Sequence, residues 1–169
     1  QPMTAGKRII EYKGEVITWP EALRRHPHDP QDPDHTFYFQ IDDKHVIAGQ
    51  GTIGLEIMED LADFDVMIIP VGGGGLSSGI ATAIKARRPA TSIIGVEPAL
   101  YPSLSAELRG EEAKVGGATI AEGIAVKKVG KLTSQILRQL MERVILVSED
   151  DLERAVTLFA TVEKSVAEG

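Results

Sequence analysis

The stretch Val66–Arg88, VMIIPVGGGGLSSGIATAIKARR, decides the fold. It places four consecutive glycines between an apolar run typical of a buried strand and a helix-like run that is rich in small residues. Pro89 follows and is expected to end that helix. The next apolar run, SIIGVE at Ser92–Glu97, is predicted to be a second strand. A strand, a helix and a strand in this order indicate a parallel sheet.

The same alternation continues on both sides of this unit, so we predict an α/β fold with a mostly parallel sheet flanked by helices. On the amino-terminal side, GTIGLEIMEDL is predicted to be a helix with Thr52 as its N-cap and with Ile53, Ile57 and Leu61 on one face. On the carboxyl-terminal side we predict a helix at 102–110, a glycine-rich loop at 114–126, a helix at 131–142, a strand at 143–149 and a helix at 150–168, opened by a capping box of Ser148 and Asp151.

Residues 1–40 give no clear assignment. They contain the short strand-like runs RIIEY, EVITW and TFYFQ, separated by a polar loop with three prolines at Arg25–His35. This loop gathers imidazoles and carboxylates that metals can use, but its prolines prevent a regular ligand face, and no metal site is predicted. These side chains are His26, His28, Asp29, Asp32, Asp34 and His35.

Composition excludes several classes of function. A formal charge of −7 and a pI near 5.1 oppose nucleic-acid binding, which depends on clustered Lys and Arg. The absence of cysteine excludes disulfides and thiolate chemistry and fits a cytoplasmic protein. No signal peptide or membrane-spanning segment is predicted. The start Gln1-Pro2-Met3 leads us to expect a partial chain.

The glycine run itself predicts a binding site for an anion. A glycine-rich turn between a strand and a helix gathers backbone N–H groups at the positive end of the helix dipole. Gly72, Gly73, Gly74 and Gly75 allow the close approach of an anion, and Leu76 and Ser77 supply N–H groups of the first helical turn. The alternative is a tight connection that holds no ligand. A single phosphate group fits best, because the run lacks the third glycine of a dinucleotide fingerprint and the lysine of a P-loop.

Several ordered motifs resemble threonine dehydratase, a threonine ammonia-lyase of the fold-type-II pyridoxal phosphate enzymes. They are IAGQGTIGLEI at Ile47–Ile57, IIPVGGGGLSSGIA at Ile68–Ala81, GVEP at Gly95–Pro98, AEGIAVK at Ala121–Lys127 and SEDDLERAV at Ser148–Val156. The resemblance runs from about Asp42 to the carboxyl terminus. It implies the large domain of that fold, so residues 41–169 are interpreted as a partial cofactor-binding domain.

The resemblance implies pyridoxal phosphate as the cofactor. By motif match, Gly72, Gly73, Gly74, Gly75 and Leu76 bind its phosphate, and Glu122 and Gly123 lie beside its ring. Some relatives hold a divalent cation with three groups that correspond here to Glu97, Tyr101 and Ser103. Ser103 replaces an acidic residue of that site, so no metal is predicted.

The sequence also departs from the family pattern. The motif of the Schiff-base lysine, Ser-x-Lys-x-Arg-Gly, and the substrate loop, Ser-Ser-Gly-Asn-His, are both missing. Lys85, Lys127, Lys128 and Lys131 are interpreted as solvated surface residues rather than substitutes. No catalytic residue is therefore assigned, and whether this chain is itself an enzyme stays open.

We interpret the chain as a fragment or truncated homologue of threonine dehydratase, with weak cofactor binding by itself. The intact enzyme that the resemblance implies converts threonine, with serine as a second substrate, to 2-oxobutanoate and ammonia. One alternative is a non-catalytic remnant that binds a phosphorylated metabolite or a partner subunit, and another is a dinucleotide-binding module that uses Glu97. Half of a two-domain fold leaves apolar surface uncovered, which predicts a homo-oligomer or pairing with a missing chain.

Overall fold

A computed structural model describes residues 42–167 of the chain. The chain divides into two compact units, Gln1–Phe39 and Gln40–Gly169, and the second contains all of the described residues. The strands predicted before residue 41 and the polar loop at Arg25–His35 lie outside the described residues.

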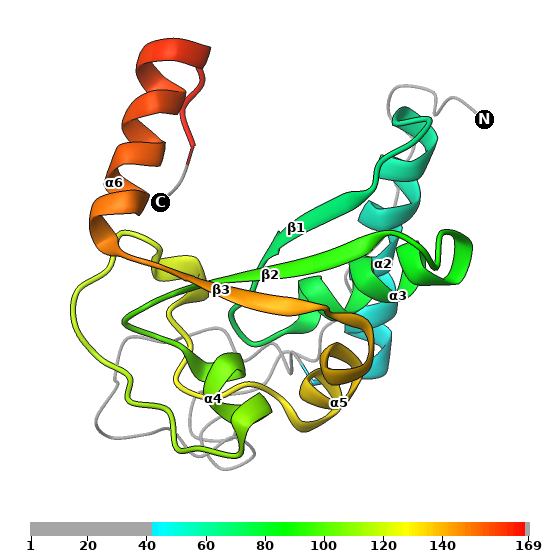
Figure 1. The fold of residues 1–169 in the computed structure, drawn as a ribbon, viewed down its shortest axis with the longest axis horizontal. Helices are drawn as coiled ribbons and strands as arrows, with labels where there is room; N and C mark the ends of the chain where they lie inside the picture. The colour runs from blue at the N-terminus through cyan, green and yellow to red at the C-terminus, as the bar shows by residue number, and fades with distance from the viewer. Residues whose placement is uncertain (1–41, 168–169) are drawn as a thin grey trace, which may run out of the picture. The chain divides into compact units, whose positions relative to one another are not determined.

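Helices and strands alternate through the second unit, as the α/β prediction requires (Figure 1). In chain order they are α2 (Lys44–Asp60), β1 (Val66–Pro70), α3 (Gly75–Arg87), β2 (Ser92–Pro98), α4 (Ser103–Arg109), the short 3-10 helix η1 (Glu122–Ile124), α5 (Lys131–Leu140), β3 (Arg143–Val147), α6 (Glu149–Leu158) and the π-helical turn η2 (Phe159–Glu163). Each element predicted within residues 42–167 has a counterpart, although α2 begins at Lys44, well before the predicted N-cap Thr52, and α6 ends at Leu158 rather than at residue 168. None of the helices within residues 42–167 is long and apolar enough to cross a membrane.

The three strands form a parallel sheet in the order β1-β2-β3, which confirms the predicted sheet. Ile68 pairs with Ile94, and Ile94 pairs in turn with Arg143. Because the strands run the same way, their carboxyl ends meet at one edge. Ligands of open α/β sheets bind outside this edge. The glycine run follows β1 directly at this edge.

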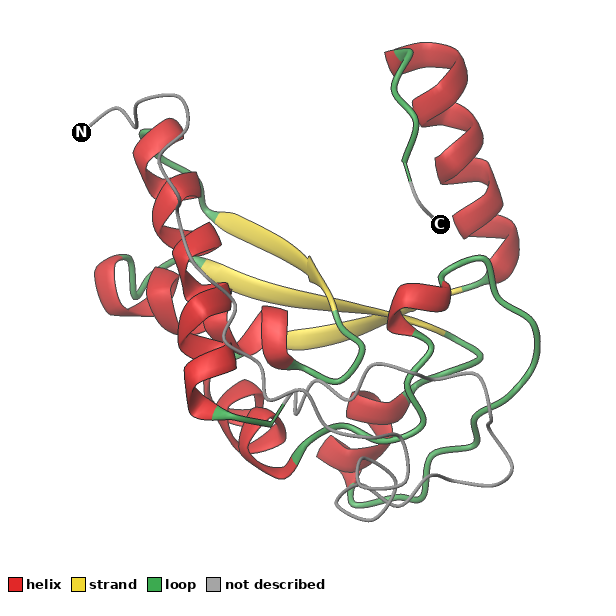
Figure 2. Ribbon diagram, turned by 180° about the vertical axis from the view of Figure 1, so that it is seen from behind, coloured by secondary structure: helices red, strands yellow, loops and turns green. Residues whose placement is uncertain are grey.

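One face of the sheet is covered by helices, and the core lies between them (Figures 1 and 2). Ile69 of β1 and Ile93 of β2 point into this layer and are almost fully buried. They belong to one apolar cluster with side chains of three helices, namely Ile80, Ala81 and Ile84 of α3, Leu104 of α4 and Leu137 of α5. Packing of these apolar side chains fixes α3 and α5 beneath the strands.

The opposite face of the sheet is exposed on β1 and β3, although Ile94 of β2 is buried there, so the prediction that VMIIPV is a buried strand was wrong for this face of β1. Val66 is 47% exposed, Ile68 62% and Ile145 39%. The strand register places these side chains on one face, because Val66 and Ile68 are two positions apart and Ile145 aligns, through Val96, with Pro70, two positions after Ile68. Parallel sheets are normally covered on both faces, so this apolar surface lacks the layer that such a sheet usually has.

Helix α2 begins earlier than predicted and buries a different face. Its N-cap is Asp43 rather than Thr52, with the Asp43 carboxylate accepting from the N–H of His45 at 2.7 Å. This backbone hydrogen bond lowers the pKa of Asp43. The buried positions of α2 are Ile47, Gly51 and Gly54, whereas Ile53 and Leu61 are exposed.

Glycines bring α2 and α3 close together. A Cβ at Gly54 would lie 3.1 Å from the carbonyl oxygen of Ile80, and a Cβ at Gly79 would overlap the carbonyl oxygen of Ile47. The two backbones therefore meet where side chains would otherwise separate them. A pattern of apolar residues cannot reveal a face made of glycine, which is why Ile53, Ile57 and Leu61 gave the wrong face.

The capping box of Ser148 and Asp151 opens α6, as predicted. The Ser148 hydroxyl, and after it the Ser148 backbone N–H, lowers the pKa of the Asp151 carboxyl. No residue of α6 is buried, and the helix extends away from the end of β3 (Figures 1 and 2). Leu158, Phe159 and Val162 are each about half exposed or more, at 48%, 48% and 64%.

Candidate functional site

The glycine run forms the turn between β1 and α3. Val71 still pairs with the sheet, since its N–H donates to the Val96 carbonyl at 2.8 Å. The chain then bends, and Gly74 takes φ +90° as the N-cap of α3. This left-handed conformation favours glycine. A Cβ at Gly74 would also lie 2.8 Å from the Cβ of Thr133, so space and backbone conformation both require glycine here.

The turn presents backbone donors that have no acceptor among the described residues. The first hydrogen bond of α3 runs from the Ser78 N–H to the Gly74 carbonyl at 2.9 Å, and the Ser77 hydroxyl donates to the same oxygen at 3.2 Å. Within residues 42–167, no acceptor pairs with the backbone N–H groups from Gly72 to Ser77. These donors lie at the positive end of the α3 dipole, which is an arrangement that suits an anion.

The structure brings the predicted ring-side segment against the glycine turn. A Cβ at Gly72 would lie 3.0 Å from the Cα of Ile124 and 3.2 Å from Cγ2 of Val126. Glu122 and Gly123, in η1 with Ile124, are exposed. Two segments about fifty residues apart in the sequence are thus in contact at this turn, in which Gly73, Gly74 and Gly75 are buried and Gly72 and Leu76 are partly exposed.

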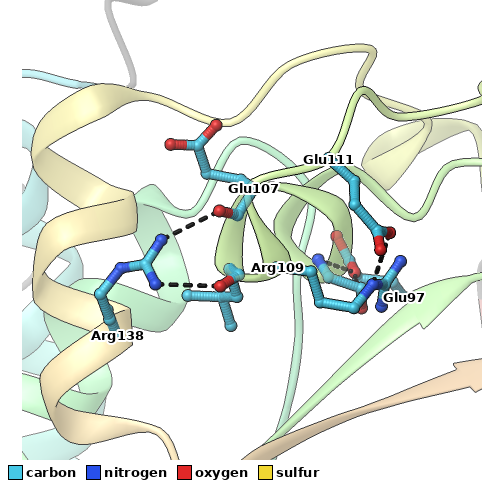
Figure 3. A network of polar contacts seen from close by, with 7 residues as sticks. Glu97, Glu107, Arg109, Glu111 and Arg138 are labelled. Atoms are coloured by element: carbon cyan, nitrogen blue, oxygen red, sulfur yellow. Dashed lines mark hydrogen bonds and ion pairs between the residues drawn. The ribbon is translucent and has the colours of Figure 1, made fainter.

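Glu97, at the carboxyl end of β2, is fully buried and is used within the protein (Figure 3). One carboxylate oxygen accepts from the N–H of Leu104 at 2.6 Å, and the other accepts from the N–H and hydroxyl of Ser105 at 2.9 and 2.7 Å. The side chain therefore caps α4 from β2. It does not face solvent, which argues against the ribose contact that a dinucleotide-binding module requires.

Ser103 also makes an internal contact. Its hydroxyl donates to the Val126 carbonyl and ties the start of α4 to the segment after η1. Glu97 and Ser103 thus both serve α4 and its neighbours. Among residues 42–167, no group of three or more His, Asp or Glu side chains gathers in a way that could hold a metal ion.

Helix α4 is held at its other end as well (Figure 3). The Arg138 guanidinium of α5 donates to the carbonyls of Leu108 and Glu107, both at 2.9 Å. Next to it, Arg109 and Glu111 form an ion pair at 2.7 Å in which both side chains are more than half exposed. An exposed pair of this kind contributes about 0–1 kcal/mol.

Two residues near the glycine turn were not found from the sequence. The Asp42 carboxylate accepts from the N–H groups of Lys131 and Thr133, 89 and 91 residues away, and so caps α5. Thr133 is fully buried, and its hydroxyl donates to the Gly73 carbonyl at 3.0 Å. No local pattern signals a cap that comes from so far along the chain.

Lys85, Lys128 and Lys131 have surface settings. The Lys85 ammonium, on α3, donates to the Pro89 carbonyl at 2.9 Å at the far end of that helix, and Lys128 and Lys131 are exposed. A lysine that reacts as a nucleophile at neutral pH needs desolvation or neighbouring cations. These three side chains have the surface setting that the sequence predicted.

Comparison with known proteins identifies the class. Residues 1–169 match the family model "Pyridoxal-phosphate dependent enzyme", so the chain belongs to this family. The match includes the first forty residues, which the motif resemblance did not cover. The cofactor of this family is pyridoxal phosphate.

Within this family, the chain is similar to enzymes that act on threonine or serine. The L-threonine ammonia-lyase of Thermotoga maritima is 47% identical over 135 residues, which are 79% of this chain and 34% of that protein. The threonine deaminase of T.th. superposes with a TM-score of 0.69 at 39% identity, over 75% of this chain and 49% of that one. Maize serine racemase superposes with a TM-score of 0.71 at 32% identity, over 77% and 41%. The chain thus spans about a third to a half of the length of these proteins.

Proposed function

We propose that this chain forms the phosphate-binding part of the cofactor site in an enzyme that resembles threonine dehydratase. Gly72, Gly73, Gly74, Gly75 and Leu76 bind the phosphate of pyridoxal phosphate through their backbone N–H groups. Glu122 and Gly123 lie beside the ring. The observation that carries the proposal is the row of N–H groups at the α3 N-terminus that have no acceptor within residues 42–167.

The residues present fit a phosphate. An oxyanion with several acceptor lone pairs can use donors that converge from one turn, and the helix dipole adds to the attraction. Glu97, the acid at the end of the neighbouring strand, is turned inward onto α4. When bound, the cofactor would supply an electron sink for negative charge at the α-carbon of an amino acid. The chain's own contribution is to hold and orient the phosphate.

Binding by this chain alone is expected to be weak. Three charge-assisted hydrogen bonds at about 1.5–3 kcal/mol each, with about 1 kcal/mol from the helix dipole, must offset an association cost of at least about 4 kcal/mol. What remains corresponds to an affinity of about millimolar or weaker, and at best about tens of micromolar.

The activity of the whole protein is part of the proposal. The names of the relatives support deamination of threonine. The motif resemblance implies 2-oxobutanoate and ammonia as the products and serine as a second substrate. The lysine that carries the cofactor in this family has no matching motif in this sequence, so the lysine chemistry is placed outside the chain. That absence also supports the second candidate, a non-catalytic remnant that binds a phosphorylated metabolite. A cysteine-free sequence fits a cytoplasmic setting for either.

A binding experiment with the 169-residue chain tests the proposal. We expect pyridoxal phosphate to raise the unfolding temperature more than pyridoxal does at equal concentration, because only the former carries the phosphate. After borohydride treatment, intact mass is expected to show no single specific adduct. Equal effects of the two compounds would contradict phosphate recognition. A single reducible adduct would instead reveal a lysine that completes the site.

We further propose that the purified chain self-associates through the uncovered face of its sheet. Val66, Ile68 and Ile145 lie on this face, and a second exposed apolar stretch is formed by Leu158, the last residue of α6, and Phe159, the first residue of η2. Because each copy offers both surfaces, two copies can cover them reciprocally.

Light scattering coupled to gel filtration measures this self-association. The variant Ile68→Asp should shift the protein toward monomer, because it places a charge on the face. The control Ala86→Glu changes an exposed position of α3, which packs beneath the other face of the sheet, and should leave the mass unchanged. A strictly monomeric wild type at high concentration would contradict this proposal.

A further inference from the structure

Helix α5 depends on a cap that comes from outside its own sequence. Its N-cap position is Gly130, which has no side chain to accept a hydrogen bond. The two carboxylate oxygens of Asp42 accept instead from the N–H groups of Lys131 and Thr133, each at 3.0 Å. A Cβ at Gly130 would overlap this carboxylate, so the glycine leaves the space that Asp42 occupies. Asp42 thereby fixes the first turn of α5.

The first turn of α5 hydrogen-bonds to the backbone of the glycine run. The Thr133 hydroxyl donates to the Gly73 carbonyl at 3.0 Å, with the Gly130 carbonyl as a competing acceptor at 3.1 Å. The Gly130 N–H lies 3.4 Å from the same Gly73 oxygen. Thr133 also fills the space that a side chain at Gly74 would need.

The contact with Gly73 sets the direction of a donor. In a trans peptide, the carbonyl of one residue and the N–H of the next point in opposite directions. The structure has no cis peptide bonds within its described residues. Because the Gly73 carbonyl is held toward α5, the N–H of Gly74 points away from α5.

From these contacts we infer that Thr133 and Asp42 are positioning residues of the phosphate site. Thr133 holds the Gly73–Gly74 peptide with its N–H directed at the ligand, and Asp42 holds Thr133 in place by capping α5. The inference rests on the proposed phosphate-binding function. Both side chains act through the backbone of the turn and not by touching the cofactor.

The variant Thr133→Val tests the inference, because it keeps the shape of the side chain and removes its hydroxyl. We expect affinity for pyridoxal phosphate, measured by titration of 15N-glycine amide signals in the full chain, to fall about fivefold to tenfold, the equivalent of one lost hydrogen bond. Binding of pyridoxal should not change. Thr133→Ser retains the hydroxyl and should restore most of the affinity.

The matched control is Thr82→Val, which removes a threonine hydroxyl that bonds the Ser78 carbonyl on α3 and does not contact the turn. It should leave the affinity unchanged. Unchanged affinity in a folded Thr133→Val protein, or an equal loss for pyridoxal, would overturn the inference.

A second measurement separates this inference from the proposed function. In the protein without ligand, Thr133→Val should shift the Gly74 amide signal and speed its hydrogen exchange, whereas Thr82→Val should not. If the wild type fails to bind pyridoxal phosphate while the Gly74 amide responds, the proposed function is wrong and the peptide is nonetheless held by Thr133. If the Gly74 amide does not respond, Thr133 does not position it and the inference is overturned.

Discussion

Replacing Gly74 by alanine is expected to lower the free energy of unfolding by about 2–5 kcal/mol, the largest loss among the substitutions proposed for this chain. Two costs combine. Gly74 has φ +90°, a left-handed conformation that penalises a side chain, and the new Cβ would lie 2.8 Å from the Cβ of Thr133 and 2.9 Å from its hydroxyl oxygen. Urea denaturation of the purified chain measures the loss.

The matched control for this substitution is Gly110→Ala. Gly110 also has a left-handed conformation, with φ +72°, but no atom lies within 4 Å of the position of its Cβ. Only the backbone strain applies, so a loss of about 1–2 kcal/mol is expected. Equal losses at the two positions would show that Thr133 does not crowd Gly74. Phosphate binding should be lost in Gly74→Ala and kept in Gly110→Ala.

The second large effect is expected from Glu97→Gln, which should lower the free energy of unfolding by about 2–4 kcal/mol. The glutamine amide has one oxygen where the carboxylate has two. Its NH2 group must therefore face donors of α4, either the N–H of Leu104 or the N–H of Ser105, in a site without solvent. Denaturation curves measured at neutral pH give the difference.

Glu111→Gln provides the comparison for this change, since the chemistry of the substitution is the same and Figure 3 shows both residues beside α4. Glu111 pairs with Arg109 in solvent, at more than half exposure of both side chains. Its loss should cost at most about 1 kcal/mol. A Glu97→Gln protein as stable as Glu111→Gln would contradict the capping role of Glu97.

Local patterns were sufficient to predict the order of elements and the parallel sheet. The apolar runs that became β1 and β2 and the helix between them follow from sequence spacing. The packed face of α2 could not be predicted from sequence spacing, because Gly51 and Gly54 contribute close backbone contact rather than apolar side chains. The exposure of Ile68 could not be predicted either, because it depends on what covers the sheet and not on the strand itself.

The turn between β1 and α3 could be predicted from the sequence, because it is made of consecutive residues, and its role in binding phosphate stays a prediction. The residues that hold this turn in place could not be predicted from the sequence. Asp42 and Thr133 form hydrogen bonds with residues far away in the sequence, and no local sequence pattern distinguishes either from other polar residues. The sequence offered Glu97 as the ribose contact of the dinucleotide-binding alternative, whereas the fold turns its carboxylate onto the N-terminus of α4.

The most direct test of phosphate recognition by the glycine turn is a 15N-glycine spectrum of the chain during titration with pyridoxal phosphate, pyridoxal and inorganic phosphate. We predict that the amide signals of Gly72, Gly73, Gly74 and Gly75 move with the two phosphate-bearing compounds and stay in place with pyridoxal. Gly110 and Gly116 should not move with any of the three. Unmoved turn signals, or turn signals that respond equally to pyridoxal, would contradict the assignment of this turn as the phosphate site.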